Sequence, residues 1–267
     1  MIHTDTFLEI GSQHRTCEDY IIQGNSPAPY IILADGCSSS LNTEMGARIL
    51  CHLAKQYLRY RQDDIYEISY EKMGQWIIHN AEMTVRQLGL NLSCLDATLI
   101  IALHNDYDLR IFMYGDGAIV QKFYDQKPKI TIVEFTSNAP YYLSYKIDDD
   151  RHSQYHEMKT EKQIGVYSGS EPINFEDQAY DYPTELKIDV RDFDVLFICS
   201  DGIQSFLVEN PSERRILSPV EMLDDFMAFK NVKGEYLKRR MKRELKDLRK
   251  RGINHYDDLS IGSFMRT

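Results

Sequence analysis

The sequence predicts an α+β fold in which antiparallel sheets are covered by helices. Strand-like apolar runs outnumber helix-like segments, and most neighbouring strands are separated by short turns typical of hairpins. The helices fall into two pairs, one early in the chain and one late. The 267 residues and 43% apolar content are sufficient for a sizeable core, so we expect residues 1–267 to form a single domain.

The predicted strands are short runs rich in β-branched and aromatic residues. The clearest run, Tyr30–Gly36, is apolar until it ends in an acid and a glycine. A second run of this kind covers residues 195–200 and is followed by Asp-Gly. The other predicted strands are residues 7–10, 20–22, 96–104, 109–114, 118–124, 130–135, 186–190 and 259–265.

Four segments have the periodicity or the end signals of helices. Apolar residues about four apart predict helices over residues 43–60 and 69–88, each with one face on a sheet. Ser218, followed by Pro219 and by Glu221, has the pattern of a capping box and predicts a helix that runs to Phe229. The last helix should cover residues 235–251. We interpret its many Lys and Arg residues as a solvated face, with docking of an acidic partner as the alternative.

Residues 136–183 lose clear periodicity and are rich in Tyr and Asp. A long irregular stretch inside a compact domain is often a loop or flap beside a functional site. We therefore predict a flap or insertion here.

Composition excludes several classes of protein. A formal net charge of −10 argues against bulk nucleic-acid binding, which requires clustered Lys and Arg. The five cysteines contain no Cys-x-x-Cys pair of the kind found in zinc or redox sites. No basic, apolar signal peptide and no apolar run of about 18 residues occurs. We therefore expect a cytoplasmic protein that binds neither nucleic acid nor membrane.

Acidic residues recur at the ends of the predicted strands. Asp35 and Asp201 each end an apolar run and precede a glycine, Glu18 and Asp19 precede another run, and Asp257 with Asp258 precedes the last one. Taken singly, an Asp-Gly pair favours an ordinary turn. Four acidic strand ends are harder to explain as turns. Asp116, between two glycines, is a further candidate, with a hairpin turn as the equal alternative.

A cluster of carboxylates is most simply stabilised by a hard divalent cation, since close carboxylates repel each other. If Asp35, Asp201 and Asp257 converge, the site suits Mg²⁺ or Mn²⁺ rather than zinc. Two ions that share Asp35 would lower the pKa of a water and clamp a phosphoryl group. The Gly36 carbonyl would supply another oxygen, while Asp19 and Glu18 would hold metal-bound waters.

At this point the sequence resembles the metal-dependent PP2C-type serine/threonine protein phosphatases, and its bacterial branch in particular. The resemblance follows the order and spacing of several short motifs along nearly the whole chain. These are Cys-Glu-Asp at 17–19, Ala-Asp-Gly at 34–36, Asp-Ala-Thr at 96–98, Gly-Asp-Gly at 115–117, Ser-Asp-Gly at 200–202 and Asp-Asp-Leu-Ser at 257–260.

The resemblance implies a four-layer α/β/β/α sandwich with two central, mainly antiparallel sheets and a dinuclear Mn²⁺ or Mg²⁺ centre at one end. By position in the motifs, Asp35 would bridge the ions and Gly36 would bind through its carbonyl. Asp201 and Asp257 would be further ligands, and Asp116 matches the acid that helps to bind a weaker third ion. The 136–183 region overlaps the family's substrate-influencing flap.

The chain departs from the family pattern at two places. Many members have an arginine that binds substrate phosphate five residues before the Asp matched by Asp19, whereas this chain has His14 there and Arg15 one step later. We predict that His14 donates to the phosphate or protonates the leaving group, with Arg15 as the competing phosphate ligand. Cys37 replaces the histidine often credited as general acid.

The leading hypothesis is a phosphatase of phosphoserine and phosphothreonine in proteins, which acts by attack of a metal-activated water. We expect a monomer paired with a serine/threonine kinase. The alternatives are an inactive module that binds phosphoproteins and a phosphatase of a small phosphorylated metabolite. The retained acids disfavour a pure binding module, because it has little reason to keep so many neighbouring charges.

Overall fold

The structure, a computed structural model, describes residues 1–123, 125–169, 172–210 and 213–267. In this described part, seven strands form one sheet in the order β1-β15-β11-β6-β7-β8-β9, and five form a second in the order β10-β5-β4-β3-β2. Every assigned pair of neighbours is antiparallel. The larger sheet consists of β1 (Ile2–Glu9), β15 (Leu259–Arg266), β11 (Val195–Cys199), β6 (Gly117–Lys122), β7 (Lys129–Phe135), β8 (Glu161–Tyr167) and β9 (Pro172–Ala179). The smaller consists of β10 (Thr184–Asp189), β5 (Asp108–Tyr114), β4 (Ala97–His104), β3 (Tyr30–Gly36) and β2 (Tyr20–Gly24).

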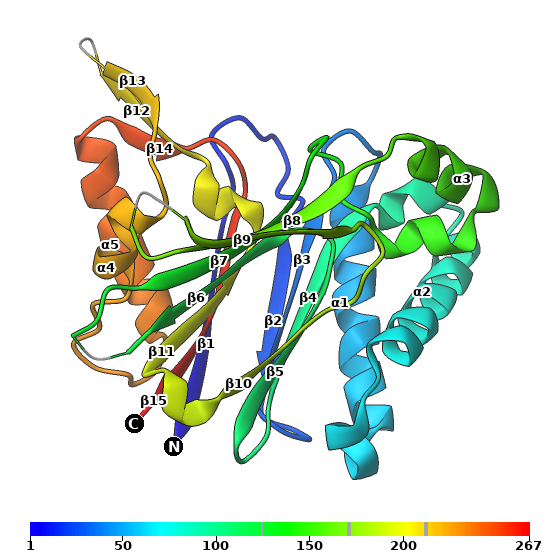
Figure 1. The fold of residues 1–267 in the computed structure, drawn as a ribbon, viewed down its shortest axis with the longest axis horizontal. Coiled ribbons are helices and arrows are strands. Elements are labelled where there is room, and N and C mark those ends of the chain that lie inside the picture. Colours follow the sequence, from blue (N-terminus) through cyan, green and yellow to red (C-terminus); the bar gives the residue numbers. More distant parts are fainter. Residues whose placement is uncertain (124, 170–171, 211–212) are drawn as a thin grey trace.

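Helices cover the outer faces of both sheets. Figure 1 shows α1 (Thr43–Tyr60) and α2 (Tyr70–Gln87) on one side and α4 (Val220–Phe226) and α5 (Tyr236–Lys250) on the other, with the sheets between them. The shorter α3 (Asp149–Glu157) lies near the end of the α1–α2 layer. Single 3₁₀ segments are Gln62–Glu67, Leu92–Leu95, Leu143–Ile147, Val190–Asp192 and Asp201–Gln204. The four-layer α/β/β/α prediction is confirmed.

Three apolar cores separate the four layers, one between the sheets and one under each helix pair. The strand β3 shows how the sequence builds two of them. Ile31 and Leu33 face the core between the sheets, while Tyr30, Ile32 and Ala34 face α1 and α2. Because successive strand residues point to opposite faces, a strand buried on both faces reads as a continuous apolar run.

The prediction of an irregular stretch over residues 136–183 is wrong as a description of structure. This stretch contains α3, β8 and β9, and residues 170–171 within it lie outside the described residues. The strand predicted over 118–124 ends at Lys122, and residue 124 likewise lies outside the described part. The helix predicted to reach Phe229 ends at Phe226.

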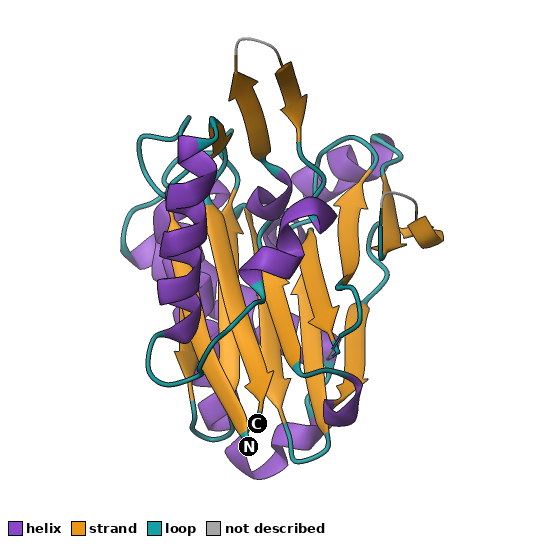
Figure 2. Ribbon diagram, turned by 90° about the vertical axis from the view of Figure 1, so that its left-hand side faces the viewer, coloured by secondary structure: helices purple, strands orange, loops and turns teal. Residues whose placement is uncertain are grey.

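A small antiparallel sheet of β13 (Glu213–Ile216), β12 (Phe206–Asn210) and β14 (Ile253–His255) was not predicted. The hairpin of β12 and β13 projects beyond the large sheets, at the end opposite to the two termini (Figures 1 and 2). Among the described residues, none of the helices combines the length and the apolar composition that a membrane span requires.

Candidate metal centre

Four of the predicted acidic residues line one cavity at an end of the two sheets. Asp35, Asp116, Asp201 and Asp257 border a space of about 300 Å³. They come from the end of β3, the turn between β5 and β6, the segment after β11 and the turn before β15. The same cavity is bordered by Gly36, Cys37, Ser38, Ser39, Thr98, Asn138, Pro140 and Tyr142.

Antiparallel register explains why residues so distant in sequence meet. The end of β11 pairs with β15, where Cys199 lies opposite Ile261, and the Ser200 N–H donates to the Ser260 carbonyl over 3.0 Å. This places Asp201 beside the turn that carries Asp257. The second sheet delivers Asp35, because β3 ends at the same end of the molecule.

The cluster is electrostatically unfavourable without a countercharge. Burial, and then the charges of Asp19, Asp201 and Asp116, raise the pKa of Asp35 well above its ordinary value. Burial raises the pKa of Asp19 to about 7, and burial with the charge of Asp257 raises that of Asp201 to about 6. Burial and Asp201 raise the pKa of Asp116 in the same way. Protons or cations must therefore accompany these carboxyls at neutral pH.

The donor set fits a hard cation in its composition. The carboxylates are all oxygen donors, as Mg²⁺ and Mn²⁺ prefer. Asp19 Oδ1 and Thr98 Oγ1 are buried without a hydrogen-bond partner within the described structure. However, no group of three or more His, Cys, Asp or Glu side chains among the described residues is arranged so that it could hold an ion as it stands. The side chains therefore gather without a finished coordination geometry.

Gly36 borders the cavity at a position that only glycine can occupy. A Cβ built there would lie 2.7 Å from Thr43 Cβ and 3.0 Å from the Glu18 carbonyl oxygen. The chain is thus packed closely between α1 and the segment before β2, and the Gly36 N–H donates to that Glu18 carbonyl over 3.2 Å.

Asp19 and Glu18 occupy different surroundings. Asp19 is 2% exposed, and its Oδ2 accepts from Ser200 Oγ over 2.9 Å, beside Asp35. Glu18 lies to the side, where its Oε1 accepts from Thr43 Oγ1 over 3.1 Å. Neither Asp19 nor Glu18 is among the residues that border the cavity.

His14 is brought to the acidic cluster, whereas the adjacent Arg15 is exposed. His14 Nε2 lies 3.2 Å from Asp257 Oδ1, and its Nδ1 lies 3.2 Å from Asp258 Oδ2 and 3.8 Å from Glu18 Oε2. Burial alone would lower the His14 pKa, but Asp258 and Asp257 outweigh it and raise the pKa. These contacts favour the cationic form of the imidazole, which lies against Asp257 of the cavity lining.

Asp258 is a site residue to which sequence reasoning gave no role. Its side chain is buried, with Oδ1 accepting from the Gly11 N–H over 2.8 Å and Oδ2 from the Glu18 N–H over 2.6 Å. It thereby fixes the 11–18 segment, including His14, against the turn that carries Asp257. The only sequence signal was its place in the Asp257-Asp258 pair.

Comparisons with known proteins identify the relatives of this arrangement. The family model described as Protein phosphatase 2C matches residues 11–248. Stp1 of Staphylococcus aureus, a serine/threonine phosphatase, aligns over 100% of this chain and 96% of its own, with a TM-score of 0.57 and 13% identity. The serine/threonine phosphatase of S. agalactiae aligns over 100% of both chains, with a TM-score of 0.57 and 14% identity.

The catalytic domain of the serine/threonine protein phosphatase PstP, in complex with 2 manganese ions, aligns over 99% of this chain and 97% of its own. The TM-score is 0.53 and the identity 16%. No curated protein matches the chain in sequence. The solved structures share the fold, and the family model covers most of the sequence, including all of the motif acids up to Asp201. The chain therefore belongs to the protein phosphatase 2C family.

Proposed function

We propose that this family member hydrolyses phosphoserine and phosphothreonine in proteins with the help of bound Mn²⁺ or Mg²⁺. The observation that carries the proposal is the convergence of Asp35, Asp116, Asp201 and Asp257 on one cavity. A phosphate monoester is dianionic, so such an acidic site is suited to it only when cations are present.

Asp35, Asp201, Asp257 and the Gly36 carbonyl would hold two ions, and Asp116 would contribute to a weaker third. Asp19 and Glu18 would orient the waters of these ions. The complex of PstP with 2 manganese ions supports this choice of metal. When bound, the ions would supply positive charge to the phosphoryl group and an acidified water as nucleophile.

Among the side chains of the protein, His14 would make the direct contact with the substrate phosphate. Its raised pKa favours the cationic form, which can donate a charge-assisted hydrogen bond to a phosphoryl oxygen or a proton to the leaving oxygen. Arg15 is exposed and is the second candidate for the phosphate. Asp258 would keep His14 in place through its bonds to Gly11 and Glu18.

A phosphorylated protein, supplied by a serine/threonine kinase, is the proposed substrate, and residues 136–183 are the proposed flap over it. Asn138, Pro140 and Tyr142 border the same cavity as the acids, which supports contact of this segment with substrate. We further propose that the chain works as a cytoplasmic monomer.

The decisive experiment is Mn²⁺-dependent cleavage of p-nitrophenyl phosphate and of a phosphothreonine peptide. We expect Asp35→Asn and Asp201→Asn to lower the turnover of both substrates at least ~100-fold, because each removes a charged oxygen donor. Asp64→Asn is the matched control, since Asp64 is 61% exposed and far from the cavity in sequence and fold. Turnover in the presence of a chelator, or full activity in both variants, would contradict the proposal.

A further inference from the structure

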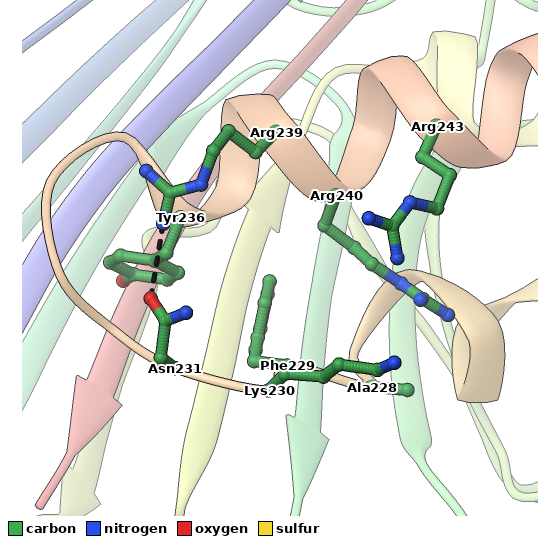
Figure 3. Close-up of a pocket in the computed structure, with 8 residues that line it drawn as sticks. All are labelled: Ala228, Phe229, Lys230, Asn231, Tyr236, Arg239, Arg240 and Arg243. Atoms are coloured by element: carbon green, nitrogen blue, oxygen red, sulfur yellow. Dashed lines mark hydrogen bonds between the residues drawn. The ribbon is translucent and has the colours of Figure 1, made fainter.

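A second pocket lies in the outer helical layer, against α5. It is an open pocket with a volume of about 150 Å³, lined by the first turns of α5 and the segment after α4. Figure 3 shows Arg239, Arg240 and Arg243 of α5 turned toward this segment, with Lys230 opposite them. Apart from Tyr236, every ionisable group that lines this described pocket is a cation.

The cations are positioned mainly by neutral oxygens. Arg239 Nη2 donates to the Lys233 carbonyl over 2.6 Å and to Asn231 Oδ1 over 3.2 Å. Arg240 Nε donates to the Asp225 carbonyl over 2.5 Å, although its Nη1 also lies 3.2 Å from Glu244 Oε1. Glu244 pairs with Arg240, and the charges of Glu235 and Asp247 act on Arg239 and Arg243, but none of these three acids lines the pocket.

The floor of the pocket is aromatic and rigid. The rings of Phe229 and Tyr236 meet edge to face with centroids 5.1 Å apart. Tyr236 is 2% exposed, and its hydroxyl lies 3.1 Å from Ser263 Oγ and 3.2 Å from the Ser263 carbonyl in β15. A cationic rim over an apolar floor suits a side chain that ends in a phosphate and begins with a methylene or methyl group.

We propose that this pocket binds a phosphoserine or phosphothreonine of the protein substrate other than the one being hydrolysed. The inference rests on the proposed function, because it assigns the pocket to substrates that carry two phosphates. Three or more neighbouring cations match the charge of a phosphate dianion better than that of one carboxylate. The pocket thereby favours multiply phosphorylated proteins over singly phosphorylated ones.

The position of the pocket sets the spacing of the two phosphates. Tyr236 is bonded to Ser263, while Asp257 precedes the other end of β15. At about 3.3 Å per residue, these two points of the chain are roughly 20 Å apart along the strand. A substrate segment must therefore place at least about six extended residues between its phosphates to occupy both sites.

Binding is tested by fluorescence polarisation of a labelled peptide with two phosphothreonines about ten residues apart. The Asp35→Asn background is used so that binding is read without turnover. We expect the doubly substituted variant, Lys230→Ala with Arg243→Ala, to weaken binding about tenfold or more. Lys246→Ala, an exposed lysine of the same helix outside the pocket, is the matched control and should bind as its parent does.

Kinetics with Mn²⁺ in the otherwise native chain provide the second measurement. The KM of the doubly phosphorylated peptide should be below that of the singly phosphorylated one, and the pocket variant should lose this difference. Turnover of p-nitrophenyl phosphate should be unchanged in the pocket variant, since neither residue lies at the acidic cavity. A wild type that binds the peptide through the pocket but cleaves nothing would overturn the proposed function and leave the pocket proposal standing.

Two further measurements, displacement by inorganic phosphate and binding to lipid vesicles, identify which phosphate-bearing ligand the pocket binds. Equal binding by the pocket variant and the Lys246→Ala control would overturn the proposal. So would displacement by inorganic phosphate as efficiently as by the unlabelled phosphopeptide, which assigns the pocket to the free ion. Lysine- and arginine-dependent binding to phosphatidylserine vesicles, without discrimination between phosphorylated and unphosphorylated peptide, would instead assign it to a lipid surface.

Discussion

At the scale of single residues, the contacts of His14 define its expected role. Its two ring nitrogens each lie 3.2 Å from a carboxylate oxygen, one of Asp257 and one of Asp258. We expect His14→Ala to lower kcat/KM for a phosphothreonine peptide at least ~tenfold and to flatten the pH–rate profile on its basic limb. The exposed His79 supplies the control His79→Ala. An unchanged profile in His14→Ala would exclude its assigned role.

Asp258 gives a second prediction at this scale, and it concerns stability. In Asp258→Ala, the N–H groups of Gly11 and Glu18 would lose their acceptors. Because an unsatisfied buried donor costs about 1–3 kcal/mol, we expect the free energy of unfolding to fall by about 2–4 kcal/mol. Urea unfolding measures the change. Asp258→Asn keeps one acceptor and should lose less; equal stability of all three proteins would contradict the prediction.

The site residues that could be predicted from sequence are those whose role is indicated by their immediate neighbours in the chain. Asp35 and Asp201 each end an apolar strand and precede a glycine, so the pattern itself predicts an acid at a sheet end. The role of Asp258 could not be predicted, because its donors lie about 240 residues away in sequence. The choice between His14 and Arg15 depends on the loop conformation, in which His14 N–H bonds the Gly11 carbonyl.

At the scale of elements, one carboxylate joins the proposed flap to the loop that follows Asp35. Asp96 is buried and accepts from Ser40 Oγ (2.7 Å), Ser144 Oγ (2.6 Å) and Arg151 Nη2 (2.8 Å). Ser40 belongs to the loop after β3, whereas Ser144 and Arg151 belong to the segment with α3. Both segments contribute residues to the acidic cavity, so this cluster should hold the flap in register with the site.

Arg151→Ala should therefore affect large substrates more than small ones. We expect the KM of a phosphothreonine peptide to rise about tenfold while kcat for p-nitrophenyl phosphate changes less than about twofold. Arg151→Lys should restore part of the effect, because it returns a cation to Asp96. Arg191→Ala is the control on an 81% exposed arginine. A proportional loss with both substrates would show that the contact does not act through the flap.

The elements missed in the 136–183 segment carry no periodic signal. The strand β9 is almost entirely exposed, so its residues do not alternate between a buried and a solvated face. The helix α3 is nine residues long, highly polar, and buries Tyr155 alone among its residues. Burial is what imposes a pattern on sequence, so these edge elements could not be distinguished from a loop.

At the scale of the whole molecule, the layers could be predicted and the finished site could not. Two pairs of amphipathic helices and a set of doubly buried strands favour helices outside and sheets inside. The geometry of the carboxylates depends instead on whatever neutralises them, protons or cations, since burial and mutual repulsion raise their pKa values in the protein alone. No local sequence pattern specifies how burial, repulsion and neutralising charge combine at this site.

The raised pKa values of the buried carboxyls also predict how the stability of the fold depends on pH. The folded chain holds protons on Asp19 and Asp201, with pKa values of about 7 and about 6, which the unfolded chain releases near 3.8. At these two groups the folded state therefore binds more protons than the unfolded state between about pH 4 and pH 7, so their contribution to stability falls as the pH rises through this window.

Saturating Mn²⁺ should remove this decline, because cations replace the protons between the carboxyls and bind the folded state preferentially. Thermal unfolding in a chelator and in Mn²⁺, at several pH values, measures it. We expect the melting temperature of the chelated protein to drop with rising pH, and the drop to shrink in Asp19→Asn but not in Asp64→Asn. Parallel pH dependences with and without Mn²⁺ would mean that the carboxylates are not the groups through which metal stabilises the fold.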